Sequence, residues 1–151
     1  QNHRKDIYNA LMKGRSKLKK YRKLILIFPG AKEPLEMKIG FEIFCTNNNF
    51  DCEIITEFAD RAINKGEVFI IPSDRDLVSV IEKSKIQKFK LGTDYGIISY
   101  NDTPLKKVVE NGITTISTDF EAMGKLLAQM ILSEQRDQME NKCTLIVRNS
   151  L

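Results

Sequence analysis

The sequence predicts an α/β protein with a doubly wound, mainly parallel sheet of about six strands and helices on both faces. Apolar runs of four to seven residues, rich in β-branched side chains, recur along the chain. They alternate with longer segments whose apolar residues fall at helical spacing. The runs are continuous, which is typical of strands buried on both faces. The 151 residues match the size of one domain, so we expect residues 1–151 to form a single unit.

The first predicted element is an amphipathic helix. Seven basic residues lie within the eleven positions 13–23, and apolar or small residues recur through the same stretch at helical spacing. We therefore expect the basic side chains to form the solvent-exposed face of this helix. Contact with nucleic acid is the alternative, although a charge run alone is weak evidence for it. The predicted buried stripe consists of Ile7, Ala10, Leu11, Gly14, Leu18 and Tyr21.

Six apolar runs predict the strands, and the segments between them predict helices. Two of the runs end at a proline, Pro29 and Pro72, which interrupts a strand. The predicted strands cover residues 24–28, 52–58, 68–71, 95–100, 113–117 and 143–147. The predicted helices between them cover residues 33–48, a segment after Pro72, a short stretch within 105–110, and a segment after residue 118.

Two of these helices begin with the spacing of a capping box, in which a hydroxyl and a carboxylate each bond to a backbone N–H. The pairs are Ser73 with Asp76, and Thr118 with Glu121. We expect the first helix to turn Leu77, Val78 and Ile81 toward the sheet. The second carries Phe120, Met123, Gly124, Leu127 and Ile131 on one side. The helix over 33–48 ends in Asn residues, which tolerate the left-handed conformation of a closing turn.

Composition excludes several classes of protein. No apolar run approaches the roughly 20 residues of a membrane span. The odd, widely spaced cysteines Cys45, Cys52 and Cys143 indicate reduced core thiols of a cytoplasmic protein. His3 is the only histidine, which argues against a zinc site or a Ser-His-Asp triad. The Gly-rich phosphate-binding motifs and the G-x-S-x-G nucleophile motif are absent from the sequence. These absences argue against most hydrolase and metalloenzyme chemistry.

Candidate ligand contacts follow the predicted strands. In open α/β sheets, ligands bind beyond the carboxyl ends of the strands. The positions there include carboxylates, an amide, hydroxyls and an aromatic ring, which together can hold a polyol. Each also has a structural interpretation, because Ser73, Asp74 and Thr118 could serve helix starts, Asn101 a turn and Phe58 the core. The positions are Pro29-Gly30, Phe58, Ser73-Asp74-Arg75, Asn101-Asp102-Thr103 and Thr118-Asp119.

The segment YGIISYNDTPLKKVVENGITTISTD, residues 95–119, resembles the end of the effector-binding domain in lac-repressor-type (LacI/GalR) regulators. In that family, a strand ends in an acidic or amide-containing turn and is followed by a loop, an L-T-T-I-like strand and a helix with an early glycine. Upstream, Gly40-Phe41 matches a G-F or G-W pair, and residues 71–74 match an apolar strand ending in N-D. Arg148-Asn149-Ser150 matches the end of the last strand.

The resemblance implies one lobe of a two-lobe domain that looks like a periplasmic sugar-binding protein. This chain looks like the C-terminal lobe, and the partner lobe and the DNA-binding head lie outside it. The short connection after Phe58 and the D-R-D-L sequence at 74–77 are similar to a variant in winged-helix (GntR-type) regulators. The implied ligand-binding residues are Phe58 as a stacking ring, with Ser73, Asp74, Asn101, Asp102 and Lys38.

Three departures from the family pattern leave the effector open. Met37 stands where the family has an arginine, Ser73 replaces an amide, and Asn101 replaces an acidic residue. A non-sugar effector is therefore an alternative. The resemblance as a whole implies a cytoplasmic, homodimeric transcription regulator with no catalytic activity, no cofactor and no metal. Its expected small-molecule effector is a sugar or sugar derivative, and it binds DNA through a separate head. A lobe of a transport-type binding protein is one alternative. A small flavodoxin-like enzyme is another, and a bound flavin's visible absorbance would identify it.

Overall fold

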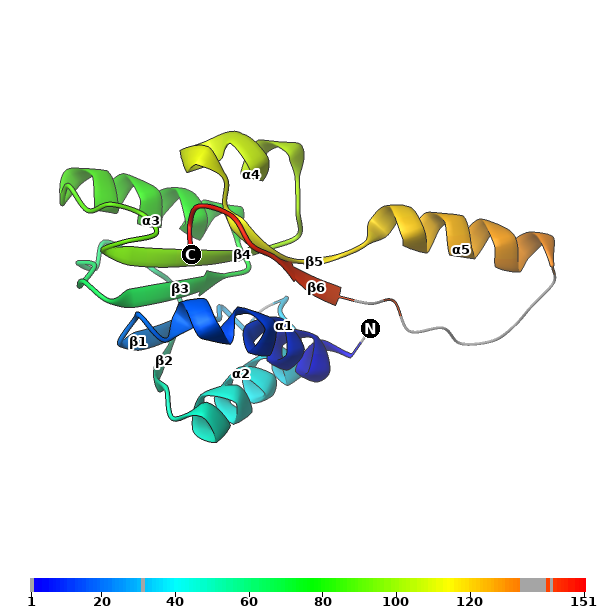
Figure 1. Cartoon of the computed structure of the whole chain (residues 1–151), viewed down its shortest axis with the longest axis horizontal. Coiled ribbons are helices and arrows are strands. Elements are labelled where there is room, and N and C mark those ends of the chain that lie inside the picture. Colours follow the sequence, from blue (N-terminus) through cyan, green and yellow to red (C-terminus); the bar gives the residue numbers. More distant parts are fainter. Residues whose placement is uncertain (1, 31, 134–140, 142) are drawn as a thin grey trace.

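The computed structural model describes residues 2–30, 32–133, 141 and 143–151. At the centre of the fold lies a sheet of six strands. Its strands are β1 (Lys23–Ile27), β2 (Asp51–Ile55), β3 (Glu67–Ile71), β4 (Tyr95–Tyr100), β5 (Thr114–Thr118) and β6 (Cys143–Ile146). The strand order is β2-β1-β3-β4-β5-β6. Neighbouring strands from β1 to β5 pair in parallel, and β6 pairs antiparallel with β5. The predicted fold class, a mainly parallel doubly wound sheet, is confirmed (Figure 1).

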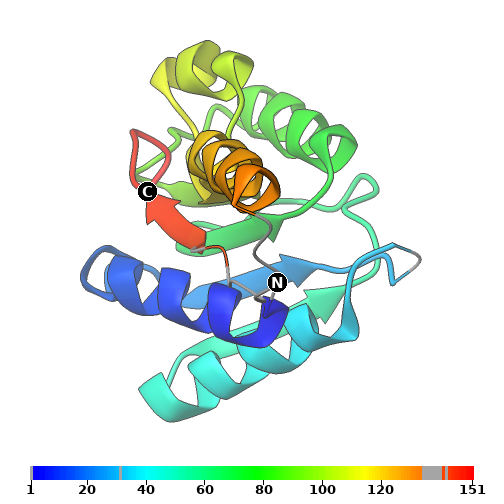
Figure 2. The same ribbon diagram turned by 90° about the vertical axis from the view of Figure 1, so that its right-hand side faces the viewer.

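Helices cover both faces of this sheet (Figures 1 and 2). They are α1 (His3–Leu18), α2 (Leu35–Asn48), α3 (Asp74–Ile86), α4 (Pro104–Val108) with the following 3-10 turn η1 (Val109–Asn111), and α5 (Phe120–Leu132). α1 and α2 pack against each other on one face, and α3 lies over the other. Within the described ranges, no helix combines the length and the apolar character that crossing a membrane requires.

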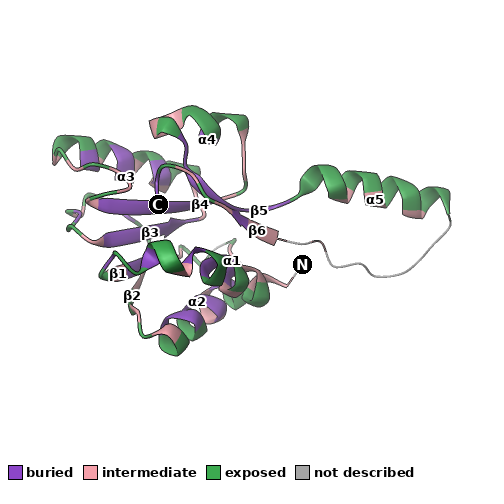
Figure 3. Cartoon of the chain, in the orientation of Figure 1, coloured by how far each residue is buried: buried purple, intermediate pink, exposed green. Residues whose placement is uncertain are grey.

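The amphipathic pattern of α1 is confirmed. All six residues of the predicted stripe are buried, including Tyr21 just beyond the end of the helix. Lys13 and Lys17 of the same helix are exposed, and Figure 3 shows both buried and exposed segments along α1. Asn2 begins the helix, because its side chain accepts a hydrogen bond from the backbone N–H of Lys5 at 3.2 Å. Only three of the seven basic residues, Lys13, Arg15 and Lys17, lie within α1, whereas the other four follow the helix and Lys23 begins β1. The prediction that the whole run lies on one helix is therefore wrong beyond Leu18.

The sheet separates two hydrophobic cores. Leu24 and Leu26 of β1 enter the core beneath α1 and α2, where they join residues such as Phe41. Ile25 and Ile27 of the same strand enter the core beneath α3. Successive side chains of a strand point to opposite faces, so β1 is buried on both. This double burial explains the continuous apolar run in the sequence.

The two predicted capping boxes do not form. Ser73 precedes α3 as its N-cap, but its side chain makes no capping bond. Asp76 instead accepts a hydrogen bond from the backbone N–H of Phe58 at 3.3 Å. The N-cap of α5 is Asp119 rather than the preceding threonine, and Asp119 Oδ1 accepts from the Ala122 N–H at 2.9 Å. A carboxylate alone caps α5, which is as effective as a hydroxyl.

Other differences concern burial and strand length. Val78 is 54% exposed, because α3 turns Val80 rather than Val78 toward the sheet. Of the expected core thiols, Cys45 is buried but Cys52 is exposed, because Cys52 lies on the edge strand β2. β2 ends at Ile55, three residues before the predicted end, and the chain then bends toward β3.

Candidate functional site

The carboxyl ends of five strands meet at one edge of the sheet, which we call the carboxyl edge. β1 to β5 are parallel, so their last residues all lie at this edge. The chain runs from β1 outward to β2 and then crosses to β3 on the other side of β1. The direction of winding therefore reverses at β1. In open α/β sheets, ligands bind in the crevice outside the carboxyl ends at such a reversal.

A polar hollow of ≈ 380 Å³ opens at the carboxyl edge, beside this reversal. Segments that follow β1, β2 and β3 form it, and the lining includes Pro29, Thr56, Glu57, Ser73, Arg75 and Asp76. Ser73 is one of the predicted ligand residues, and its hydroxyl is not used to cap α3. Hydroxyls, carboxylates and a guanidinium supply both donors and acceptors. The hollow therefore suits a polar molecule with several hydroxyl groups.

Asp74 and Asn101, two further predicted site residues, also lie at the carboxyl edge. Asp74 begins α3, and its side chain is 73% exposed while its Oδ1 lies 2.7 Å from Lys106 Nζ. Asn101 follows β4 with a positive φ of 59° and is exposed. Lys106 Nζ also donates a hydrogen bond to the backbone carbonyl of Asn101 at 3.1 Å. Lys106 thus contacts both of these predicted ligand-binding residues.

Asp102, another predicted ligand residue, is engaged inside the protein. Its Oδ1 and Oδ2 accept hydrogen bonds from Arg148 Nη1 at 2.6 Å and Nη2 at 2.9 Å. Thr115 Oγ1 donates a further hydrogen bond to Asp102 Oδ1 at 3.1 Å. The hydrogen bond from Arg148 is the main cause that holds the Asp102 pKa below its ordinary value, and Thr115 adds to it. In this arrangement, Asp102 fixes the turn after β4 to the end of the chain.

Phe58 does not offer its ring at the carboxyl edge. It is 2% exposed and packs edge-on against Phe69, with 5.6 Å between the ring centroids. The expected stacking surface for a ligand is therefore not presented, and the core interpretation of Phe58 fits its position. The physical reason is the early end of β2, after which the ring joins the core beneath α3. Lys38 lies half-buried near the start of α2 and does not line the polar hollow.

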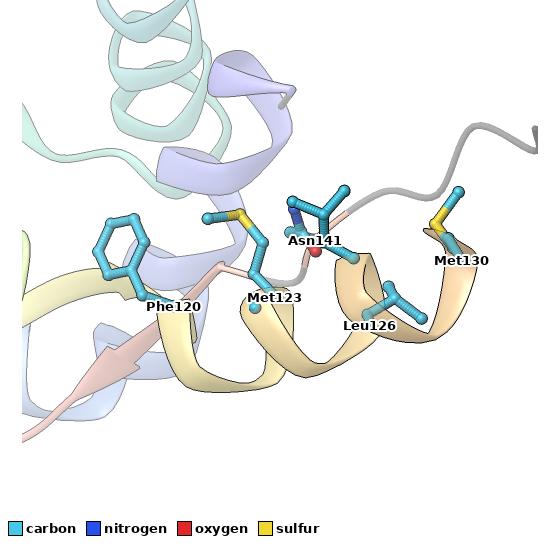
Figure 4. A pocket seen from close by; sticks show the side chains of 7 residues that line it. Phe120, Met123, Leu126, Met130 and Asn141 are labelled. Atoms are coloured by element: carbon cyan, nitrogen blue, oxygen red, sulfur yellow. The ribbon is translucent and has the colours of Figure 1, made fainter. Parts of the chain in front are cut away.

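α5 leaves the carboxyl edge directly after β5 and extends away from the sheet (Figures 1 and 3). It is rich in apolar residues, yet none of them is buried, and Leu127 and Ile131 are 58% and 70% exposed. Phe120, Met123 and Asn141 lie along a groove of ≈ 340 Å³ on one side of the helix (Figure 4). A helix of such apolar character is ordinarily buried. Within the described residues, no element covers it.

Sequence reasoning missed three residues of the carboxyl edge. Thr56 and Glu57 line the hollow, but the predicted strand ran through them to residue 58. Their position directly after β2 would have identified them if the strand end had been placed correctly. Lys106 is buried, whereas its neighbour Lys107 is exposed. Only the fold distinguishes these adjacent lysines.

Comparison with solved structures finds the same fold in bacterial regulators. At 15% identity and a TM-score of 0.72, 99% of this chain aligns with 63% of a LacI family transcriptional regulator from Lactobacillus casei with bound glucose. At 11% identity and a TM-score of 0.73, 99% aligns with 62% of the Escherichia coli transcriptional repressor ascG. A transcription regulator like protein from Staphylococcus haemolyticus gives 15% identity, a TM-score of 0.73, and coverage of 100% and 60%.

The chain therefore spans about three-fifths of the length of these structural relatives. A search of curated proteins by sequence finds no match. The family profile described as a periplasmic binding protein-like domain matches residues 17–151, which include the whole sheet and the carboxyl edge. The resemblance to effector-binding domains that the sequence indicated is confirmed at the level of family and fold. The chain belongs to the periplasmic binding protein-like domain family and has the fold of LacI-family transcriptional regulators.

Proposed function

We propose that this chain is the sensing lobe of a transcription regulator and that it binds a sugar or sugar derivative at the carboxyl edge. The polar hollow carries the proposal, because it lies at the winding reversal with Ser73 in its lining. Asp74 and Asn101 add exposed oxygen and nitrogen atoms at the same edge. Structural relatives are described with bound glucose, sucrose and cellobiose, which supports a sugar as the ligand class.

The ligand lies between this lobe and a second lobe of the same protein. α5 extends from the carboxyl edge and exposes Phe120, Leu127 and Ile131. Burying such side chains stabilises a protein by about 1.5–3 kcal/mol each, so a covering surface is strongly favoured. The structural relatives are longer than this chain, and this chain covers 63% of one of them. A lobe that covers α5 also faces the carboxyl edge, since the helix begins there.

The mechanism is differential binding rather than catalysis. An effector held by both lobes favours the arrangement in which they close on it, and this shifts the population of the regulator. A separate DNA-binding head, of the helix-turn-helix or winged-helix (GntR) type, responds to that shift. The regulator acts in the cytoplasm as a homodimer, which allows two heads to bind two half-sites.

Calorimetry with a protein that carries both lobes tests this function. Glucose, sucrose and cellobiose are titrated first, and the best-bound sugar is then used with single variants. Asp74→Ala and Asn101→Ala should each weaken binding at least about tenfold, because each removes a polar group at the carboxyl edge. Asp51→Ala is the matched control, since Asp51 is also exposed but begins β2 at the opposite edge. Unchanged affinity in both edge variants would contradict the proposed site.

A further inference from the structure

Lys106 lies at the carboxyl edge and is buried. No other lysine is buried within residues 2–30, 32–133, 141 and 143–151. The side chain of Lys106 is 5% exposed, although its short helix α4 is otherwise largely exposed. A lysine almost never occupies such a position unless its charge is paired and hydrogen-bonded. The partners of this ammonium group therefore indicate why it is there.

The ammonium group of Lys106 has three donors, and the structure supplies three acceptors. Nζ donates to the backbone carbonyls of Tyr100 at 2.6 Å and Asn101 at 3.1 Å. The third partner is Asp74 Oδ1 at 2.7 Å. The first acceptor belongs to the last residue of β4, the second to the turn that follows it, and the third to the residue that begins α3 after β3. Lys106 thus ties the ends of two neighbouring strands together.

The turn that Lys106 holds has an unusual backbone. Asn101 has a φ of 59°, in the left-handed region that most residues avoid. Its backbone N–H donates to the Ile116 carbonyl at 2.9 Å, and its own carbonyl accepts from Lys106. The peptide units on both sides of Asn101 are therefore fixed, while its side chain is exposed at the carboxyl edge. A backbone held in this way fixes the direction in which the Cα–Cβ bond of Asn101 points.

We infer that Lys106 is a positioning residue of the effector site: it holds the Asn101 turn and the Asp74 carboxylate in the geometry that the effector meets. This inference rests on the proposed function, because it assigns a role within that site. Lys106 itself is too buried to contact an effector directly, so it acts through the two residues that it binds. A preorganised site binds more tightly, because the ordering of its groups does not have to occur on binding.

Nuclear magnetic resonance on this chain tests the positioning without any effector. The three-bond coupling between HN and Hα of Asn101 reports its φ angle. Lys106→Met keeps a long side chain but removes both hydrogen bonds and the ion pair with Asp74, so it should shift this coupling and the Asp74 signals. Lys107→Met is the matched control, because it makes the same change at the exposed neighbour on the same helix. The inference is overturned if Lys106→Met folds and leaves the Asn101 coupling unchanged.

A second measurement needs no variant and covers the case in which Lys106→Met does not fold. The Lys106 ammonium should show slow proton exchange and scalar couplings across its hydrogen bonds to the carbonyls of Tyr100 and Asn101. A rapidly exchanging ammonium without such couplings would overturn the inference.

Calorimetry on the two-lobe protein then tests the consequence for binding. With the best-bound of glucose, sucrose and cellobiose, Lys106→Met should weaken affinity at least tenfold and Lys107→Met less than twofold. Lys106→Arg, which keeps a cation for Asp74, should recover part of the loss. Equal affinity in Lys106→Met and wild type would overturn the inference. If wild type binds none of the three sugars, the proposed sugar class fails, whereas the resonance measurements still decide whether Lys106 holds the turn.

Discussion

Gly40 allows α1 and α2 to pack closely, and replacing it by alanine should separate them. A Cβ atom at this position would collide with the backbone carbonyl of Arg4 and would lie 2.6 Å from Ile7 Cγ2. Real Cβ atoms essentially never approach other atoms so closely. The carbonyl belongs to the α1 backbone and cannot rotate away like the end of a side chain. One of the helices must therefore shift, which disturbs the core beneath both.

Two opposing effects determine how much stability Gly40→Ala loses. Alanine is favoured over glycine inside a helix by about 1 kcal/mol. Overpacking a core commonly costs about 1–3 kcal/mol, and a clash with backbone belongs at the upper end of that range. We therefore expect Gly40→Ala to destabilise the fold by roughly 1–2 kcal/mol, the difference of these two effects. For a chain of this size, that corresponds to a decrease in Tm of about 2–8 °C.

Urea and thermal unfolding, followed by circular dichroism, measure this effect. Gly124→Ala provides the matched control, because Gly124 lies within α5 and a Cβ there meets no atom within 4 Å. The control should keep the wild-type midpoint or raise the helix content. A Gly40→Ala protein as stable as wild type would refute the close packing of α1 on α2.

Three further predictions concern acid stability, thiol reactivity and α5. Arg148 lowers the Asp102 pKa in the fold, so the pair stabilises the protein above the ordinary aspartate pKa of about 3.9 and loses this effect as the pH falls further. Asp102→Asn should lower Tm at pH 7, and the difference from wild type should shrink in acid; a difference independent of pH would contradict the pairing. Burial raises the Cys143 pKa to about 11, so iodoacetamide at pH 8 should label exposed Cys52 first by mass spectrometry, and the reverse order would contradict the burial. Amide exchange in α5 should be fast in this chain and slow in the two-lobe protein, and equal rates would count against a covering lobe.

Hydrophobic periodicity was sufficient to predict most of the fold. The buried stripe of α1 from Ile7 to Leu18 follows from spacing alone, because a helix on a sheet buries only one side. The continuous run in β1 follows from burial on both faces. Phe58 could not be placed in this way, because the end of a strand depends on partner strands rather than on local pattern. Its apolar character fits a strand, a core position or a ligand contact equally well.

The candidate site was predictable in outline but not in its connections. The carboxyl-end rule placed Ser73, Asp74 and Asn101 at this edge, since it needs only the residues that follow each predicted strand. The partners of Asp102 could not be predicted, because Arg148 lies 46 residues away and reaches it only through the pairing of β5 with β6. The burial of Lys106 was not predictable either, because it depends on the fold placing its ammonium group against the carbonyl at the end of β4 and the Asp74 carboxylate. Such long-range contacts leave no local signal in the sequence.

The proposed effector site is shared between this lobe and a second one, and the ratio of the affinities of the two-lobe protein and of this chain tests that sharing most directly. Calorimetry measures the best-bound of glucose, sucrose and cellobiose against this chain alone and against the two-lobe protein. An open lobe leaves one face of the sugar in water and lacks the contacts of the other wall. Losing about 4 kcal/mol weakens binding roughly a thousandfold, so we expect at least that ratio between the two proteins. Comparable affinities would contradict the shared site.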